Sequence, residues 1–309
     1  MINQTKLAII AIAIVIPLSI FAVYATDSNM PEDKSTSKLY VVASFYPLFE
    51  FAQKVGQDKV DVTLLVPAGT EPHDWEPTIK DVQKMKNADL IIINGIGFET
   101  WVHQLDEINY QGTIVDTSYG IVANGINPTN DRLPEHDKHI DEHGDPHIWL
   151  DPILAKVQVQ NIADAFSDHD PQNEKFYQQN AKNYENELDK LDTKIRNELS
   201  GCNHDFIAFH DAFSYFSDEY SLNQHTIVLS NSPHAEPTAK TLEQIINTAK
   251  ELNIKIIFTE ETVDPRTSKI IANEIGGKIL SLSPIEIGTG KSYISRMTDN
   301  LNSLKEALC

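Results

Sequence analysis

The chain has 309 residues, of which 41% are hydrophobic and 23% are charged, a composition typical of a globular protein rather than a disordered one. It carries 45 Asp and Glu against 25 Lys and Arg, and the net charge of −20 excludes electrostatic binding to nucleic acid, which requires a basic surface. Two cysteines are too few for a disulfide scaffold or a cysteine-based zinc site. Any metal chemistry therefore depends on carboxylates and on the 11 histidines.

Residues 1–25 are predicted to direct export. Lys6 is their only charged residue, and the 18 uncharged residues 7–24 are followed by Ala25, a small residue suited to signal-peptide cleavage. A run of this length also just reaches that of a transmembrane helix, so the segment is either a signal peptide or a membrane anchor. Residues 26–37, rich in Asp, Ser, Asn and Pro, are expected to form a flexible tether. The folded part is therefore expected outside the cytoplasm, in the periplasm or at the outer face of the cytoplasmic membrane.

Residues 38–170 show the alternating pattern of an α/β domain. Short apolar runs typical of buried strands alternate with stretches of helical periodicity, which predicts a lobe with a mostly parallel sheet flanked by helices. The predicted strands are residues 39–43, 60–66, 90–93 and 113–115, and the predicted helices are residues 46–55, 78–88 and 98–107.

Residues 171–200 are predicted to form one long amphipathic helix that links two lobes. Apolar residues recur at helical spacing from Phe176 to Leu199, while Lys, Asp, Glu and Asn occupy the positions between them. About 28 residues at 1.5 Å per residue span roughly 40 Å, enough for a rigid spine along the height of both lobes. A coiled-coil dimer helix is the weaker alternative, because the apolar seam lacks a sustained heptad repeat.

Residues 201–309 repeat the α/β pattern. The predicted strands are residues 206–209, 226–229, 255–258 and 278–282, and the predicted helices are residues 211–220, 238–252, 265–275 and 292–307. The expected fold is therefore α/β, with two lobes joined by one long rigid helix. Cys202 and Cys309 both fall in this part of the chain, and an oxidising exterior favours a disulfide between them.

Three histidines occupy equivalent places in loops of the two predicted lobes. His73 lies in a loop rich in Pro and Gly between a strand and a helix, His147 lies in the segment DPHIWLDP, and His210 follows the strand 206–209. Ligands of open α/β sheets bind at the carboxyl ends of strands. Any one of these histidines alone is more often structural, but the three together predict a metal site.

Five segments, in their order and spacing, resemble one family of transport proteins. They are PAGTEPHDWEPT, DPHIWLDP, FIAFHDAFSYFSDEYSL, EPTAKTLEQIINTAKELNIKIIFTEETVDP and YISRMTDNLNSLKEAL. From about Lys38 to the C-terminus the chain resembles the metal-binding solute receptors of ABC importers, the ZnuA/TroA-like family, and its zinc type in particular. The resemblance implies a metal ion in the cleft between two lobes and its delivery to an ABC permease in the cytoplasmic membrane. It also implies that His73, His147 and His210 are the metal ligands.

The same resemblance leaves the fourth ligand open. Members of the family usually supply an Asp from a Leu-Asp-Pro-Leu-like segment, whereas this chain has Ser283 in the matching segment Leu282-Ser283-Pro284-Ile285. Three imidazoles without an assured carboxylate favour Zn²⁺ over Mn²⁺, because Mn²⁺ prefers oxygen ligands. On this interpretation, the substitution Ser283→Asp should narrow the preference for zinc.

Several acidic residues could complete the site or support it. A water molecule or one of three carboxylates could be the fourth ligand of a four-coordinate zinc site, and the sequence does not rank Glu71, Glu76 and Glu286. Histidine ligands also need hydrogen-bond acceptors that hold their rings, and the candidates are Asp211, Glu260 and Glu261.

Residues 131–146 form a segment rich in His and acids without hydrophobic periodicity, which predicts a solvated loop. Its composition resembles the His-rich loop of zinc receptors, so His136, His139 and His143 are expected to capture zinc weakly and pass it to His147. The alternative is an acidic flexible loop that binds nothing.

The sequence is also compatible with other functions. A manganese or iron receptor of the same family is one, and a surface adhesin that merely retains the fold is another. A zinc site with three histidines and an open position can activate water, so a zinc hydrolase or lyase is the enzyme alternative. The chain lacks an HExxH helix and a Gly-x-Ser-x-Gly elbow, so we expect a receptor without catalytic activity, acting as a monomer.

Overall fold

The computed structural model describes residues 38–123, 144–228, 233–234 and 236–309, which belong to one compact unit. The predicted signal peptide or anchor, the tether and the loop histidines His136, His139 and His143 lie outside the described residues. Among the helices that are described, none is both long and apolar enough to cross a membrane.

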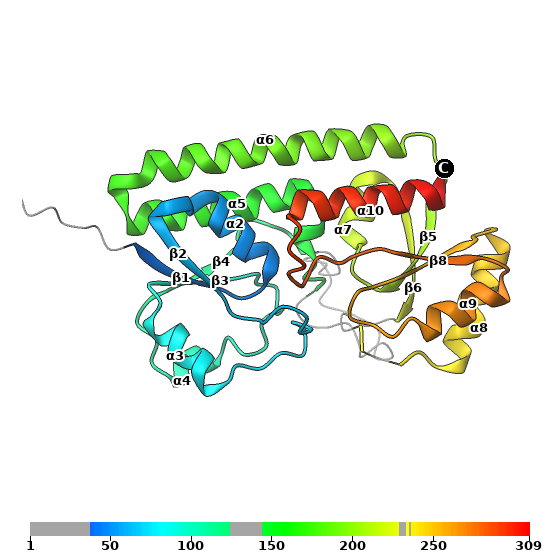
Figure 1. Ribbon diagram of the computed structural model, residues 1–309, viewed down its shortest axis with the longest axis horizontal. Helices are drawn as coiled ribbons and strands as arrows, with labels where there is room; N and C mark the ends of the chain where they lie inside the picture. Colours follow the sequence, from blue (N-terminus) through cyan, green and yellow to red (C-terminus); the bar gives the residue numbers. More distant parts are fainter. Residues whose placement is uncertain (1–37, 124–143, 229–232, 235) are drawn as a thin grey trace, which may run out of the picture. The chain divides into compact units, whose positions relative to one another are not determined.

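The first lobe contains a parallel sheet of four strands, as predicted (Figure 1). The strands are β1 (Leu39–Ala43), β2 (Val60–Leu64), β3 (Leu90–Ile93) and β4 (Thr113–Asp116), in the spatial order β2-β1-β3-β4. The chain runs outward from β1 to β2 and then crosses back to the other side of β1. This reversal between β1 and β3 creates a switch point, and loops at the carboxyl ends of strands beside such a point form binding sites.

The helices of this lobe are α2 (Tyr46–Gly56), α3 (Ile79–Asn87) and α4 (Gln104–Glu107). Thr78 and Asp81 form a capping box that fixes the start of α3. The helix predicted over residues 98–107 is shorter in the structure, where only α4 at its end is helical. Gly95, Ile96 and Gly97 all have positive φ, and the residues that follow form successive tight turns before α4 begins.

The long helix that links the lobes packs against a helix of the first lobe. Helix α5 (Pro152–His169) was not predicted, although Asp151 caps its first turn and Pro152 is suited to that position. Helix α6 (Glu174–Leu199) follows a short 3-10 turn (Pro171–Asn173) and has 26 residues, so it is about 39 Å long. It packs against α5 and α2 of the first lobe and against the last helix of the second, above which it runs in Figure 1.

The second lobe repeats the topology of the first. Its strands are β5 (Asp205–His210), β6 (Asn223–Val228), β7 (Ile256–Thr259) and β8 (Lys278–Ser281), all parallel and in the spatial order β6-β5-β7-β8. Its helices are α7 (Ser214–Tyr220), α8 (Ala239–Glu251), α9 (Arg266–Glu274) and α10 (Tyr293–Leu308). The predicted α/β fold with two lobes and one long linking helix is therefore confirmed.

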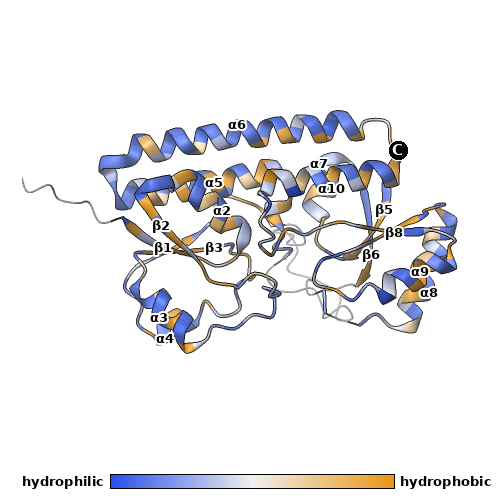
Figure 2. Cartoon of the chain, in the orientation of Figure 1, coloured by the Kyte–Doolittle hydropathy of each residue, from blue (hydrophilic) through white to orange (hydrophobic). Residues whose placement is uncertain are grey.

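The larger of two hydrophobic cores among the described residues spans both lobes. The larger buried cluster extends from Val41 and Phe51 in the first lobe through Leu188 of α6 to Phe258 and Leu304 in the second. The central strands are strongly apolar, while α6 alternates polar and apolar residues along its length (Figure 2). Because interiors are closely packed, a shared core of this kind resists bending of one lobe against the other.

A disulfide joins Cys202, just after α6, to Cys309 at the end of α10, with 4.7 Å between the two Cα atoms. It therefore fastens the linking helix to the last helix of the second lobe. The sequence favoured this pairing, and a disulfide is the state expected of a protein outside the cytoplasm.

Candidate metal centre

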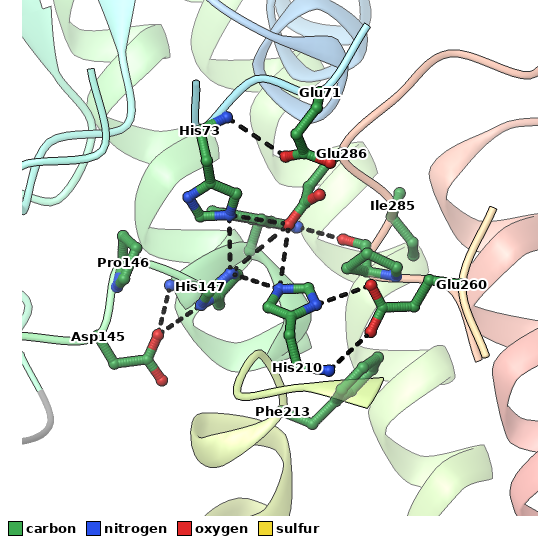
Figure 3. Close-up of polar contacts among 12 residues, drawn as sticks. Glu71, His73, Asp145, Pro146, His147, His210, Phe213, Glu260, Ile285 and Glu286 are labelled. Atoms are coloured by element: carbon green, nitrogen blue, oxygen red, sulfur yellow. Dashed lines mark hydrogen bonds and ion pairs between the residues drawn. The ribbon is translucent and has the colours of Figure 1, made fainter. Parts of the chain in front are cut away.

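Four loops or strand ends bring the predicted histidines and one glutamate together (Figure 3). His73 lies in the loop after β2, and His147 directly precedes a short 3-10 turn at the start of the connection to α5. His210 is the last residue of β5, and Glu286 lies in the loop after β8. Both lobes thus contribute side chains from the carboxyl ends of their strands, as the topology requires.

The ligand atoms of these four residues lie close enough to hold one ion. The Nε2 atom of His147 is 3.2 Å from that of His73 and 3.3 Å from that of His210. The Glu286 Oε1 atom is 3.2 Å, 3.5 Å and 3.7 Å from the Nε2 atoms of His73, His147 and His210. A tetrahedral zinc site with bonds of about 2.0–2.1 Å has edges of about 3.3–3.4 Å, and these five distances lie close to that length.

Two carboxylates fix the orientation of the histidine rings. Asp145 Oδ1 accepts a hydrogen bond from the Nδ1 atom of His147 at 2.6 Å, and Glu260 Oε2 accepts one from the Nδ1 atom of His210 at 2.7 Å. Each carboxylate also accepts the backbone N–H of the histidine that it holds. With Nδ1 of each ring donating to a carboxylate, Nε2 is the atom left to bind a metal, and the Nε2 atoms of His147 and His210 lie 3.3 Å apart.

The site is shielded from solvent. The side chains of His147 and His210 are fully buried, and those of His73 and Glu286 are 8% and 2% exposed. The ring of Phe98 packs against His73 at a centroid distance of 4.7 Å, and Trp149 packs against His147 at 5.1 Å. Charges interact more strongly in such surroundings than in water.

Burial and charge act in opposite directions on the titrating groups. Burial would lower the pKa of His147, but the charges and hydrogen bonds of Asp145 and Glu286 outweigh it and raise that pKa to about 10. Burial would likewise raise the pKa of Glu286, but the neighbouring imidazoles hold it well below its usual range. Burial lowers the pKa of His73. The four residues therefore combine one anionic oxygen with imidazole nitrogens, of which that of His147 must lose a proton before it binds a metal.

Glu71 lies beside the four residues but is held by other partners. One oxygen accepts the backbone N–H of His73 at 3.3 Å and the other accepts the hydroxyl of Thr262 at 3.2 Å. Burial, and then the charge of Glu286, raise the pKa of Glu71 to about 8. Glu71 is thus largely neutral at pH 7 and a poor fourth ligand beside Glu286.

The other candidates have partners away from the histidine rings. Glu76 accepts a hydrogen bond from Gln104 at 3.0 Å, and Asp211 accepts one from Gln224. Ser283 does not face the imidazoles, because its hydroxyl accepts from Arg296 at 2.6 Å. Glu261 pairs with the same Arg296 at 2.7 Å. Of the three carboxylates expected to hold the rings, only Glu260 contacts one of them.

Asp145 was not among the residues predicted to hold a histidine ring, although it contacts His147. Its position two residues before His147 was a usable signal, because Asp side chains commonly bind the backbone N–H two residues further on. No such sequence signal distinguishes Glu286 from the other glutamates. The position of Glu286 beside the histidines depends on the path of the loop after β8, where Ile285 has φ of 63°. For a branched residue this left-handed conformation costs on the order of 1–3 kcal/mol, so the sequence gives no reason to expect it.

A family model described as "Zinc-uptake complex component A periplasmic" matches residues 41–307. The chain belongs to this family. Membership places it among the extracytoplasmic solute receptors of uptake systems rather than among enzymes.

Individual relatives agree with this assignment. The high-affinity zinc uptake system protein ZnuA of Bacillus subtilis is 38% identical over 286 residues, which are 89% of each chain. The zinc-binding protein AdcA of Streptococcus pyogenes is 34% identical over 87% of this chain, which spans 56% of AdcA.

A solved structure extends the comparison. The laminin-binding protein Lmb of Streptococcus agalactiae, described as a bifunctional protein with adhesin and metal transporting activity, has a TM-score of 0.78 and 30% identity. The match covers 88% of this chain and 99% of Lmb. Lmb therefore shares the fold seen here.

Proposed function

We propose that the protein captures Zn²⁺ between its two lobes and delivers it to an ABC permease in the cytoplasmic membrane. The observation that carries this proposal is the convergence of His73, His147, His210 and Glu286 at tetrahedral spacing. Its ligands come from both lobes, so the bound ion links them. The zinc uptake and zinc-binding relatives support the choice of cargo.

The ligand chemistry favours zinc over manganese. Three imidazole nitrogens and one carboxylate oxygen suit a four-coordinate zinc ion, whereas Mn²⁺ prefers more oxygen ligands in an octahedral arrangement. Neighbouring carboxylates do not supply those oxygens: Glu71 is held by His73 and Thr262, and Glu260 by His210.

The same ligand count favours a receptor over a hydrolase. Catalytic zinc sites keep one position open for water, whereas structural sites fill all four positions with protein ligands. The four side chains here would occupy a tetrahedral ion completely and leave no position for a reacting water.

We further propose that residues 1–25 export the chain as a signal peptide or hold it as an anchor, and that residues 26–37 tether the folded part. The disulfide between Cys202 and Cys309 supports a location outside the cytoplasm. We expect the receptor to act as a monomer, because its four ligands all come from one chain.

Metal-dependent thermal unfolding tests the proposal. The protein is freed of metal with a chelator and then unfolded alone, with Zn²⁺ and with Mn²⁺. Zinc should stabilise it by about 4 kcal/mol at about a thousand times Kd, because a ligand that binds only the folded state stabilises it by RT ln(1 + [L]/Kd). The variant His147→Ala should lose most of this gain, while the control His204→Ala, which removes an exposed histidine bound to the Ser221 carbonyl, should keep it. If zinc stabilises both variants equally, the assignment of His147 to the metal site is wrong.

A further inference from the structure

The segment that carries Glu286 is attached to α10 by two side chains one helical turn apart. Asn300 accepts the backbone N–H of Ser283 at 2.8 Å and donates to its carbonyl oxygen at 2.7 Å. Arg296 donates to the Ser283 hydroxyl at 2.6 Å and to the carbonyl oxygen of Ile287. Arg296 is 3% exposed and Asn300 is 4% exposed. Helix α10 thus holds the segment on both sides of Glu286.

The position of Arg296 is itself fixed by further contacts. Its guanidinium group donates to Glu261 at 2.7 Å and lies 5.7 Å from the ring centroid of Tyr46 in α2. The planar guanidinium presents several donors in a rigid fork, and a lysine ammonium on a flexible chain cannot make the same set of bonds. Arginine is therefore specifically suited to bind Ser283, Ile287 and Glu261 together.

The bend that precedes Glu286 requires such support. Ile285 is fully buried and has φ of 63°, a conformation that branched residues rarely adopt. Its N–H donates to the Ser283 hydroxyl at 3.0 Å, and the carbonyl oxygen of Pro284 accepts from Trp149 Nε1 at 2.7 Å. A strained conformation persists only where surrounding contacts enforce it. The Ser283 hydroxyl is the centre of this support, because it accepts from both Ile285 and Arg296.

We propose that Arg296 is the positioning residue for the fourth metal ligand. By holding Ser283 and Ile287 it keeps Ile285 in the left-handed bend, and the bend places the carboxylate of Glu286 against the three imidazoles. Arg296 thus raises metal affinity without contacting the ion. The inference rests on the proposed function, because it concerns the affinity of that metal site.

The consequence is an energetic coupling between Arg296 and Glu286. If Arg296 acts through the carboxylate, its substitution should matter only while that carboxylate is present. A general effect on folding would instead persist when the carboxylate is removed. A double-mutant cycle distinguishes the two.

The experiment measures zinc affinity by chelator competition in the full chain and in the variants Arg296→Lys, Glu286→Ala and their combination. Arg296→Lys should weaken zinc binding by at least tenfold in the native background and by less than twofold in the Glu286→Ala background. Co²⁺ absorption provides a second readout, and Arg296→Lys should shift the ligand-field bands toward those of Glu286→Ala. Equal losses of affinity in both backgrounds, or no loss in either, would overturn the proposal.

A milder pair of variants covers the case in which Arg296→Lys does not fold. Ser283→Ala removes the hydroxyl that accepts from Arg296 and Ile285, and should also weaken zinc binding only when Glu286 is present. Ser303, Ser283 and Arg296 line one cavity, so Ser303→Ala is the matched control and should bind zinc normally. If Glu286→Ala binds zinc as tightly as the native protein while His147→Ala does not bind, this inference fails and the receptor function stands.

Discussion

Glu71 and Thr262 join the two lobes at the edge of the metal centre, where the Thr262 hydroxyl donates to the Glu71 carboxyl group at 3.2 Å. Glu71 lies in the loop after β2 and Thr262 in the loop after β7. The other oxygen of Glu71 accepts the backbone N–H of His73. The contact therefore ties the loop of one proposed ligand to the opposite lobe.

Removal of this hydroxyl should speed the release of zinc. In Thr262→Val the shape of the side chain is retained but the bond to Glu71 is lost, so the loop of His73 should separate more readily from the second lobe. We expect the zinc dissociation rate, measured by stopped-flow transfer to a chelator, to rise about three- to tenfold, which corresponds to roughly 1 kcal/mol for one hydrogen bond. Thr262→Ser keeps the hydroxyl and should release zinc at the native rate. If the valine and serine variants behave alike, the bond has no role in release.

The contrast between the predictable and unpredictable parts of this site has a physical basis. His210 could be placed from the sequence, because a buried strand ends at that residue and its side chain must therefore lie at the carboxyl end of the parallel strands. Glu286 could not be selected, because its direction depends on the left-handed bend at Ile285, which no propensity favours. Helix α5 was overlooked despite buried residues at helical spacing from Ala155 to Phe166. Local sequence patterns therefore predict helices and strands, whereas the orientation of loop side chains depends on contacts between distant segments of the chain.

Asp145 should contribute to zinc affinity through His147. Its carboxylate accepts both the ring Nδ1–H and the backbone N–H of His147, and also the hydroxyl of Ser214. Asp145→Asn removes the charge that holds the ring, and hydrogen-bond partners of metal ligands are typically worth about 10- to 100-fold in affinity. Isothermal competition titration with zinc should show a loss of that size.

Asp211→Asn is the matched control for this substitution. Asp211 lies next to His210 but accepts from Gln224 instead of from a histidine ring. The substitution Asp211→Asn removes a negative charge near the site without breaking a bond to a proposed ligand. The zinc affinity of this variant should therefore differ from the native affinity by less than threefold. Equal losses in both variants would indicate a general effect of charge and contradict the role given to Asp145.

Zinc binding should strengthen as pH rises. The pKa of His147 without metal is about 10, so the ring carries a proton at neutral pH that zinc must displace. Affinity should therefore increase about tenfold per pH unit for each displaced proton between pH 6 and 8 and continue to rise above pH 8. A His147 with an ordinary pKa near 6.5 would instead give a plateau above about pH 7. Competition with a chelator of known proton affinity measures this dependence.

The metal-free protein should show the opposite trend in stability. A pKa of His147 that is higher in the folded than in the unfolded state stabilises the fold fully below about pH 6.5. This contribution is lost as pH rises toward 10. Zinc-dependent stabilisation, measured by thermal unfolding with and without the metal, should consequently grow over the same range. If the stabilisation by zinc instead decreases with increasing pH, His147 is not the protonated metal ligand described here.

Deletion of residues 131–143 should leave the tight site intact. His147 and its partner Asp145 lie beyond the deleted segment, while His136, His139 and His143 are removed with it. Calorimetric titration should therefore show one zinc ion bound with native affinity and the loss of additional weak binding. If the native protein and the deletion variant bind the same total amount of zinc, the segment captures none.

Ser283→Asp should not shift metal selectivity, contrary to what the family pattern suggested. The side chain at position 283 faces Arg296 and a cavity of about 340 Å³, and Arg296 already binds its hydroxyl. A carboxylate there would pair with the guanidinium group instead of reaching the imidazoles.

The test compares the stabilisation of Ser283→Asp by Zn²⁺ and by Mn²⁺, with Ser303→Asp as the control on the same cavity wall. The ratio of the two metal affinities should stay within about twofold of the native ratio in both variants, because neither changes the set of ligand atoms. A selective gain in Mn²⁺ binding by Ser283→Asp alone would mean that the loop can rearrange to present position 283 to the ion. In that case the left-handed bend at Ile285 would be one of two accessible conformations, and Glu286 would share the fourth position with a residue at 283.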